Sequence, residues 1–301
     1  MSIYQEIESI LRSSSIVFVL FFAFFGACIA SFFNVVILRY QAMTDHENAT
    51  EVKEWFEDKK IKFPEELEPL LKPFNIAFPA SHCSTCKTSL NWYHNIPVFS
   101  FLFLRAKCGF CNAPISWQYP IVEICGAILL SSIYVYYIPY GLTSFLIASV
   151  FFMSIFILFC LDFKCFLLPD TINYFLLWLG ILTALNQISF TNLNIKSSIY
   201  GAVAGYLLLY FIALGGKFAF KKEAMGNGDF KLMAALGAFI GIKGVFFTVF
   251  ASPFIGIPTY ILFKLLKKNT DMIPYGPSLI LAAILYMFWG QEILKYLNIL
   301  L

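Results

Sequence analysis

Long runs of apolar residues, separated by short polar segments, recur along most of this chain. A transmembrane helix needs about 20 consecutive apolar residues to cross the hydrocarbon core of a bilayer. Eight runs approach this length, so the pattern predicts an all-α polytopic membrane protein with about eight transmembrane helices. A count of seven stays open if the short sixth run is re-entrant. The predicted spans are residues 15–38, 121–140, 143–161, 171–189, 197–219, 230–241, 244–266 and 276–298.

The composition agrees with this pattern. Hydrophobic residues make up 59% of the 301 positions and charged residues only 13%, whereas a soluble domain averages about 25% charged residues. The formal net charge of +3 is too small to indicate a nucleic-acid partner. The lipid bilayer is therefore the first partner that the sequence predicts.

One long polar segment interrupts the apolar pattern between the first and second predicted spans. Residues 45–68 mix acidic and basic side chains, which predicts a solvated helix. The chain is thus expected to comprise an N-terminal segment with the first transmembrane helix (1–38), an insert (39–120) and a transmembrane helix bundle (121–301).

The distribution of basic residues predicts the orientation of the chain. Loops that stay in the cytoplasm carry an excess of Lys and Arg. If the N-terminus lies outside, 17 of the 21 Lys and Arg residues fall on the cytoplasmic side. The opposite orientation reverses this bias, so we expect the insert to be cytoplasmic.

Two CxxC pairs in the insert predict a metal site. Cys83 and Cys86 form the first pair, Cys108 and Cys111 form the second, and 21 residues separate the pairs. Each pair presents two thiolates from a tight turn, and two such turns complete a tetrahedron around zinc. Disulfides or a redox motif are the alternatives. We favour zinc because structural disulfides are rare in a reducing cytoplasm.

Two isolated carboxyl groups suggest catalysis. Only seven of the 18 Asp and Glu residues lie after residue 70, and two of them, Asp162 and Asp229, adjoin apolar runs, where an ionisable group is a candidate for function. Two carboxyl groups held about 3 Å apart share one proton, so that one accepts a proton from water while the other polarises a carbonyl. Gly226 and Gly228, before Asp229, permit unusual backbone angles and close approach of a substrate.

Other polar residues near these motifs have alternative interpretations. Asp170, in Leu-Pro-Asp-Thr, is expected to cap a helix start. For Glu123, at the start of the second span, a structural and a functional role are equally supported. His82 and His94 lie near the cysteine pairs, but four thiolates already satisfy a metal, so we expect ordinary packing roles for both.

Two other classes of function compete with acid–base hydrolysis. A membrane transporter with a cytosolic zinc module would use intramembrane acids to line an ion path, but the sequence lacks the internal symmetry that many transporters show. A methyltransferase alone is the other alternative, and no glycine-rich loop for its cofactor is visible.

Several segments, taken together and in this order, resemble the type IV prepilin peptidases, which are bifunctional membrane enzymes of pilus and type II secretion systems. The resemblance extends from about Gly26 to Lys268. The second CxxC pair contributes to it. The other segments are GACIASFFNVVILR (26–39), FNIAFPASHCSTC (74–86), NIPVFS (95–100), ISWQYPIVE (115–123), LDFKCFLLPD (161–170) and GNGDFKLMAALGAFIG (226–241).

The resemblance implies an aspartic protease of the GxGD type, a multi-pass protein of the bacterial inner membrane that cuts at its cytoplasmic face. Asp162 and Asp229 match the catalytic pair of the family. Its substrates are prepilins and pseudopilins, which carry a short basic leader that ends in Gly. After cleavage, the new N-terminal residue is methylated with S-adenosylmethionine, an activity associated with the insert. The cofactor site is unknown, and the four paired cysteines match the zinc-binding thiols.

Two positions of the insert region depart from the family pattern. Ala106 stands where the family commonly has Gly, and Gln118 stands where it commonly has Arg. Both bear on methylation rather than on proteolysis. Asn34 and Arg39 match the first motif of the family, and they are expected either to orient the insert or to anchor the chain at the membrane interface.

Overall fold

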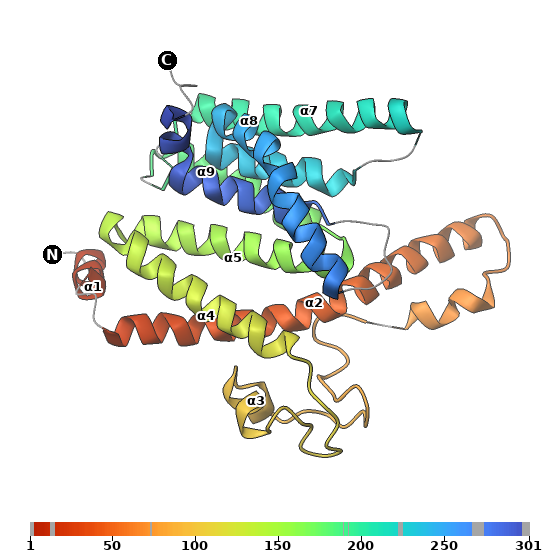
Figure 1. The fold of residues 1–301 in the computed structure, drawn as a ribbon. Helices are drawn as coiled ribbons and strands as arrows, with labels where there is room; N and C mark the ends of the chain where they lie inside the picture. Colours follow the sequence, from red (N-terminus) through yellow and green to blue (C-terminus); the bar gives the residue numbers. More distant parts are fainter. Residues whose placement is uncertain are drawn as a thin grey trace. The chain divides into compact units, whose positions relative to one another are not determined.

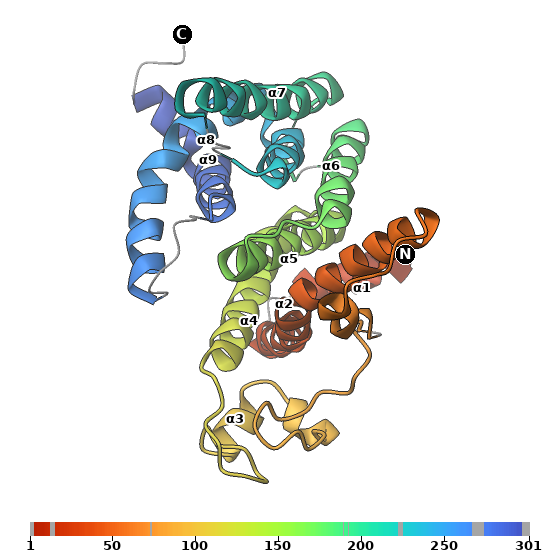
Figure 2. The same cartoon turned by 90° about the vertical axis from the view of Figure 1, so that its right-hand side faces the viewer.

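The computed structural model describes residues 3–12, 16–72, 74–188, 190–191, 193–221, 225–266 and 274–296, and no β-strand occurs among them. The predicted all-α class is therefore confirmed. The chain forms two compact units, residues 1–136 and 137–301 (Figures 1 and 2).

The first unit consists of two long helices, several short ones and the loops of the insert. Its elements are α1 (Ile3–Arg12), α2 (Ile16–Asp58), the 3-10 helices η1 (Glu65–Leu71) and η2 (Trp92–Asn95), α3 (Phe99–Phe103) and α4 (Gln118–Tyr137), which ends at the boundary between the units. The second unit contains η3 (Ile138–Tyr140), α5 (Leu142–Cys165), α6 (Asp170–Leu185), α7 (Ile195–Phe220), α8 (Asn227–Leu266) and α9 (Gly276–Tyr296).

Within the described residues, five helices are long and apolar enough to cross a membrane, and two shorter apolar helices, α6 and α9, accompany them. Within the described residues, each predicted span overlaps one of these seven elements. The predicted count of eight arises because two predicted spans fall on the single element α8, and this count stays a prediction. The five long segments are Ile16–Asp58, Gln118–Tyr140, Leu142–Cys165, Ile195–Ala219 and Asn227–Ile261.

Helix α2 continues through the expected border between the first span and the insert. It has 43 residues, which corresponds to about 65 Å at 1.5 Å per residue, about twice the thickness of the hydrocarbon core. The sequence contains no Gly or Pro from residue 27 to residue 63, so nothing in the backbone ends the helix where the composition changes. Of the solvated helix expected over residues 45–68, residues 45–58 form the last part of α2, and the helix ends at Asp58 (Figure 1).

Helix α8 is bent at the position where the sixth predicted span ends. Gly241 has φ 67° and ψ 179°, which are not helical angles. This φ favours glycine, because a side chain there is strained. Figure 1 draws α8 as segments that run in different directions. A glycine thus separates two helical segments that the sequence predicts as separate spans.

The core of the second unit surrounds the first half of α8. The side chains of Leu232, Met233 and Leu236 are fully buried. Next to them, the rings of Phe151 and Phe239 lie 4.3 Å apart, centroid to centroid. This apolar packing fixes the α8 segment that begins with Asp229.

Helices α7 and α8 approach each other through glycines. A Cβ atom on Gly201 would overlap the carbonyl oxygen of Gly237, and a Cβ atom on Gly237 would overlap that of Gly201. Gly205 likewise lies against the backbone of Met233. Small residues allow such close backbone contact between membrane helices.

Replacing Gly201 with Leu should therefore destabilise the protein by about 1–3 kcal/mol, the usual cost of overpacking. The matched control is Gly215→Leu on the same helix, because no atom lies within 4 Å of a Cβ atom at that position. Thermal unfolding in detergent measures both variants. Equal midpoints for the two would contradict the close packing of α7 against α8.

Candidate functional site

The structure brings the four paired cysteines of the insert together, as the sequence predicts. The Sγ atoms of Cys83, Cys86, Cys108 and Cys111 all lie within 4.8 Å of one another, and those of Cys83 and Cys111 are 3.8 Å apart. A tetrahedral zinc with Zn–S bonds of about 2.3 Å requires S–S distances of about 3.8 Å. The donor set and its size therefore fit a four-thiolate metal site.

The two CxxC turns have the same backbone structure. In the first, Cys83 N–H donates to Thr88 and Lys87 N–H donates to Cys83. In the second turn, Cys108 N–H donates to the residue five positions later, and Asn112 N–H donates to Cys108, four positions earlier. Both bonds therefore have the same spacing as in the first turn. The residue after each pair, Lys87 or Asn112, has a positive φ of 58° or 57°. Each turn is thus closed locally, which explains why the spacing alone predicts the site.

Hydrogen bonds from backbone N–H groups favour the thiolate form of the cysteines in both turns. Backbone N–H groups, first that of Cys86, lower the pKa of Cys83, and backbone N–H groups of the second turn lower the pKa of Cys108. Cys111 differs: the Ala113 N–H acts to lower its pKa, but desolvation and the neighbouring thiols raise it to about 11. A bound cation counteracts this crowding of sulfurs because it favours the thiolate form.

Ala106 occupies a backbone conformation that favours glycine. Its φ is 60°, and hydrogen bonds from Ala106 N–H to Phe101 and from Ile115 N–H to Ala106 fix the backbone there. The Cβ atom of an L-residue costs about 1–2 kcal/mol in this region. The departure from the family pattern at this position therefore strains the loop that leads into the second turn.

Ala106→Gly should stabilise the insert by about 1 kcal/mol through relief of this strain. Ala113→Gly, in the same loop but without a positive φ, is the matched control and should be neutral or destabilising, because glycine loses more backbone entropy on folding. The thermal unfolding midpoint of the purified protein measures both. A lower unfolding midpoint for Ala106→Gly would contradict the strain.

Two polar side chains of α2, those of Asn34 and Arg39, form hydrogen bonds to the insert. Asn34 Nδ2 donates to the carbonyl oxygen of Tyr119 at 3.1 Å, in the first turn of α4. The Arg39 guanidinium donates to the carbonyls of Asn75 and Ile76 at 3.1 and 3.0 Å. Both side chains are buried. These contacts support the expectation that the pair orients the insert.

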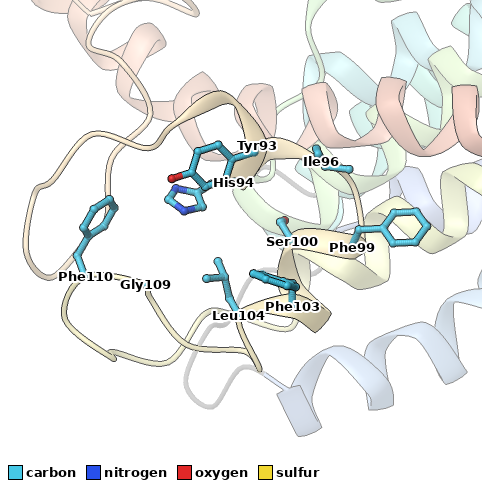
Figure 3. Close-up of a pocket in the computed structure, with 9 residues that line it drawn as sticks. All are labelled: Tyr93, His94, Ile96, Phe99, Ser100, Phe103, Leu104, Gly109 and Phe110. Carbon is cyan, nitrogen blue, oxygen red and sulfur yellow. The ribbon is translucent and has the colours of Figure 1, made fainter.

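A cavity of about 520 Å³ lies beside the second cysteine turn (Figure 3). Its wall is mostly apolar and aromatic, with a phenol, an imidazole and a hydroxyl as polar groups. The residues come from η2, α3 and the Cys108–Cys111 turn. They are Tyr93, His94, Ile96, Phe99, Ser100, Phe103, Leu104, Gly109 and Phe110.

The second unit holds the two aspartates. Asp162 lies near the end of α5 and Asp229 in the first turn of α8, and both are buried, with 5% and 8% of their surface exposed. Asp162 Oδ2 accepts a hydrogen bond from Gly276 N–H at 2.9 Å. The carboxyl group of Asp229 accepts one from Gly226 N–H and lies within direct electrostatic range of Asp162. The structure thus brings both candidates to one site.

Two further contacts join the segments that carry the aspartates. Lys231 Nζ lies 2.6 Å from Asp170 Oδ2, across α8 and α6. A Cβ atom on Gly228 would lie 2.9 Å from the Cβ atom of Leu168, so only glycine fits there. Neither Gly226 nor Gly228 has a positive φ. The expected unusual angles are therefore not found, and Gly228 serves close packing between the two segments instead.

The other two acidic candidates have structural partners. Helix α6 begins at Asp170 as predicted, but Pro169 is the N-cap residue and Asp170 pairs with Lys231 rather than capping the helix. Glu123 is buried on α4, where its Oε2 accepts the N–H of Val98 at 2.7 Å. Val98 has a φ of 61°, which is unusual for a β-branched residue.

A third segment at this site was not predicted from the sequence. Residues 274–277, Pro-Tyr-Gly-Pro, precede and begin α9. Gly276 contacts Asp162, and Tyr275 is within electrostatic range of Asp229 and 2.5 Å from Ser252 Oγ through its hydroxyl. Burial first, and then the charge of Asp229, raise the pKa of Tyr275. The only signal in the sequence is a turn-forming tetrapeptide at the start of an apolar run.

Comparison with known proteins covers both units. The model of the bacterial peptidase A24 N-terminal domain matches residues 24–137, and that of the type IV leader peptidase family matches residues 149–261. No solved structure matches the chain.

Three relatives bear the name prepilin leader peptidase/N-methyltransferase. The protein from Aeromonas hydrophila is 35% identical, and the match covers 90% of this chain and 91% of the relative. The protein from Xanthomonas campestris pv. campestris is 33% identical over 89% and 90% of the two chains. The protein from Dichelobacter nodosus is 36% identical over 91% and 93%. The chain therefore belongs to the type IV leader peptidase family.

Proposed function

We propose that this multi-pass membrane protein removes the basic leader of type IV prepilins and pseudopilins after a Gly residue and then N-methylates the new N-terminal residue. The single observation that supports the peptidase activity is that the structure brings together the two segments that contain the aspartates. Asp162 and Asp229, 67 positions apart in the sequence, are both buried, and Asp162 lies within electrostatic range of Asp229.

The proposed chemistry follows from the burial of two like charges. Two neighbouring carboxyl groups that are buried away from bulk water share one proton, because both cannot be charged together. The ionised member accepts a proton from the attacking water. The protonated member donates a hydrogen bond to the scissile carbonyl, which makes it more electrophilic. Asp162 and Asp229 together supply both functions, and neither supplies both alone.

The proposed topology suits a substrate with a basic leader and an apolar helix. With the N-terminus outside, the aspartates lie near the cytoplasmic ends of their helices, and the positive-inside rule keeps the basic leader of a substrate on that same side. The apolar helix of the substrate remains in lipid, because a spanning helix satisfies its own backbone hydrogen bonds. We place the enzyme in the bacterial inner membrane.

We infer that zinc is the metal of the cysteine site. Four thiolates are typical ligands of structural zinc, which adds folding free energy when it is bound. Cys83, Cys86, Cys108 and Cys111 would hold it and so cross-link the two turns of the insert.

S-adenosylmethionine is the proposed methyl donor, in agreement with the methyltransferase activity named for the relatives. The cavity beside the second cysteine turn is its proposed site. The donor carries a sulfonium cation, and aromatic faces such as those of Tyr93, Phe103 and Phe110 attract organic cations. Ser100 and His94 supply hydrogen-bonding groups at the same cavity.

Mass spectrometry of a co-expressed prepilin tests the two activities together. The wild-type protein should yield a pilin that lacks its leader and carries one additional methyl group. A host that lacks any prepilin peptidase supplies the background. An intact leader in the presence of the folded wild-type protein would overturn the proposal. The transporter alternative is not favoured, because the relatives are named as peptidases and methyltransferases.

A further inference from the structure

Helix α9 begins against the carboxyl group of Asp162. Its first residue, Gly276, donates its backbone N–H to Asp162 Oδ2 at 2.9 Å, in a buried bond between residues 114 positions apart. The first N–H groups of a helix have no partner within the helix, and the positive end of its dipole attracts a negative charge. The start of α9 therefore orients the carboxyl group.

The close approach requires a glycine at position 276. A Cβ atom there would lie 2.7 Å from Oδ2 and 3.2 Å from Cγ of Asp162. Any side chain at this position would therefore displace either the carboxyl group or the start of α9. The adjacent Pro277 is suited to the first turn of a helix, where its missing N–H costs nothing.

Tyr275, which precedes Gly276, connects the same turn to Asp229. The Tyr275 hydroxyl forms a hydrogen bond of 2.5 Å with Ser252 Oγ, and Ser252 is fully buried on the second half of α8. The Tyr275 side chain also lies within electrostatic range of Asp229. The Tyr275 carbonyl accepts the N–H groups of Ser278 and Leu279, so the turn is continuous with α9.

We propose that the turn 274–277 is a third element of the catalytic centre, in which Gly276 positions Asp162 through its backbone N–H and Tyr275, held by Ser252, positions the turn beside Asp229. This inference rests on the proposed peptidase function. Gly276 and Tyr275 are positioning residues, because they act through the aspartates rather than on the substrate.

Gly276→Ala tests the first contact. A misplacement of about 1 Å in a catalytic group costs about 100-fold in rate, so kcat for prepilin cleavage by the purified, detergent-solubilised protein should fall about 100-fold while KM stays unchanged. Gly215→Ala is the matched control, because its Cβ atom meets nothing within 4 Å, and it should cleave at the wild-type rate. The unfolding midpoint establishes that both variants are folded.

Tyr275→Phe and Ser252→Ala test the second contact, since each removes one oxygen. Each should lower kcat with KM unchanged, and the double variant should lose no more than either single variant, because all three remove the same bond. This double-mutant cycle tests the inference even if the Gly276→Ala protein does not accumulate in the membrane. Wild-type kcat in Tyr275→Phe, or in folded Gly276→Ala, would overturn the inference. If Asp162→Asn itself cleaves normally, the proposed function fails instead.

Discussion

Asp162→Asn and Asp229→Asn should each lower the rate of leader cleavage on the order of 10⁴-fold, the range found when one member of a catalytic unit is removed. Asparagine keeps the shape of the side chain but cannot share a proton with its neighbour. Initial rates with a purified prepilin substrate measure the effect. Both variants should still insert into the membrane, because the substitution removes a buried charge and leaves the apolar packing of α5 and α8 intact.

Asp170→Asn is the matched control in the same segment. Its carboxyl group pairs with Lys231 in a partly exposed position, and exposed ion pairs contribute at most about 1 kcal/mol. Cleavage by this variant should stay within about fivefold of the wild-type rate. Near-normal cleavage by either Asp162→Asn or Asp229→Asn would show that the two residues do not form the catalytic pair.

Cys83→Ser or Cys108→Ser should release zinc and strongly impair methylation, while cleavage survives in part. A structural zinc site contributes about 10–16 kcal/mol of binding free energy, and serine does not replace a thiolate ligand. Elemental analysis of the purified protein measures the metal, and mass spectrometry of the pilin scores the leader and the methyl group separately. Cys125→Ser, outside the cluster, should keep the metal. An unchanged zinc content in the double variant Cys83→Ser/Cys108→Ser would show that these cysteines do not bind the metal.

The sequence predicts those features of this protein that depend on local order. Apolar runs locate the helices because burial in lipid requires their length. The four cysteines are predictable because each turn closes within about six residues. The boundary expected at residue 39 stays a prediction, and no helix ends there, because α2 continues to Asp58.

The contacts of the aspartates depend on tertiary structure and are harder to predict. The isolation of Asp162 and Asp229 beside apolar runs suggests an acid–base pair, and the resemblance to a family implies the same two residues, but neither gives the groups that contact them. The bond from Gly276 to Asp162 spans 114 positions, and no local pattern records such a contact. The packing role of Gly228 against Leu168 was missed for the same reason, since a glycine in a short loop most often indicates only a turn.

The unbroken helix α2 constrains how the length of this protein can vary. Arg39 and His46 lie seven residues apart, on the same side of the helix, and hold the chain at Asn75, Ile76 and Leu70. One extra residue between them would rotate one side chain by about 100° about the helix axis relative to the other. The two side chains could then no longer both form their hydrogen bonds to residues 70–76. Insertions and deletions between Arg39 and His46 should therefore be poorly tolerated.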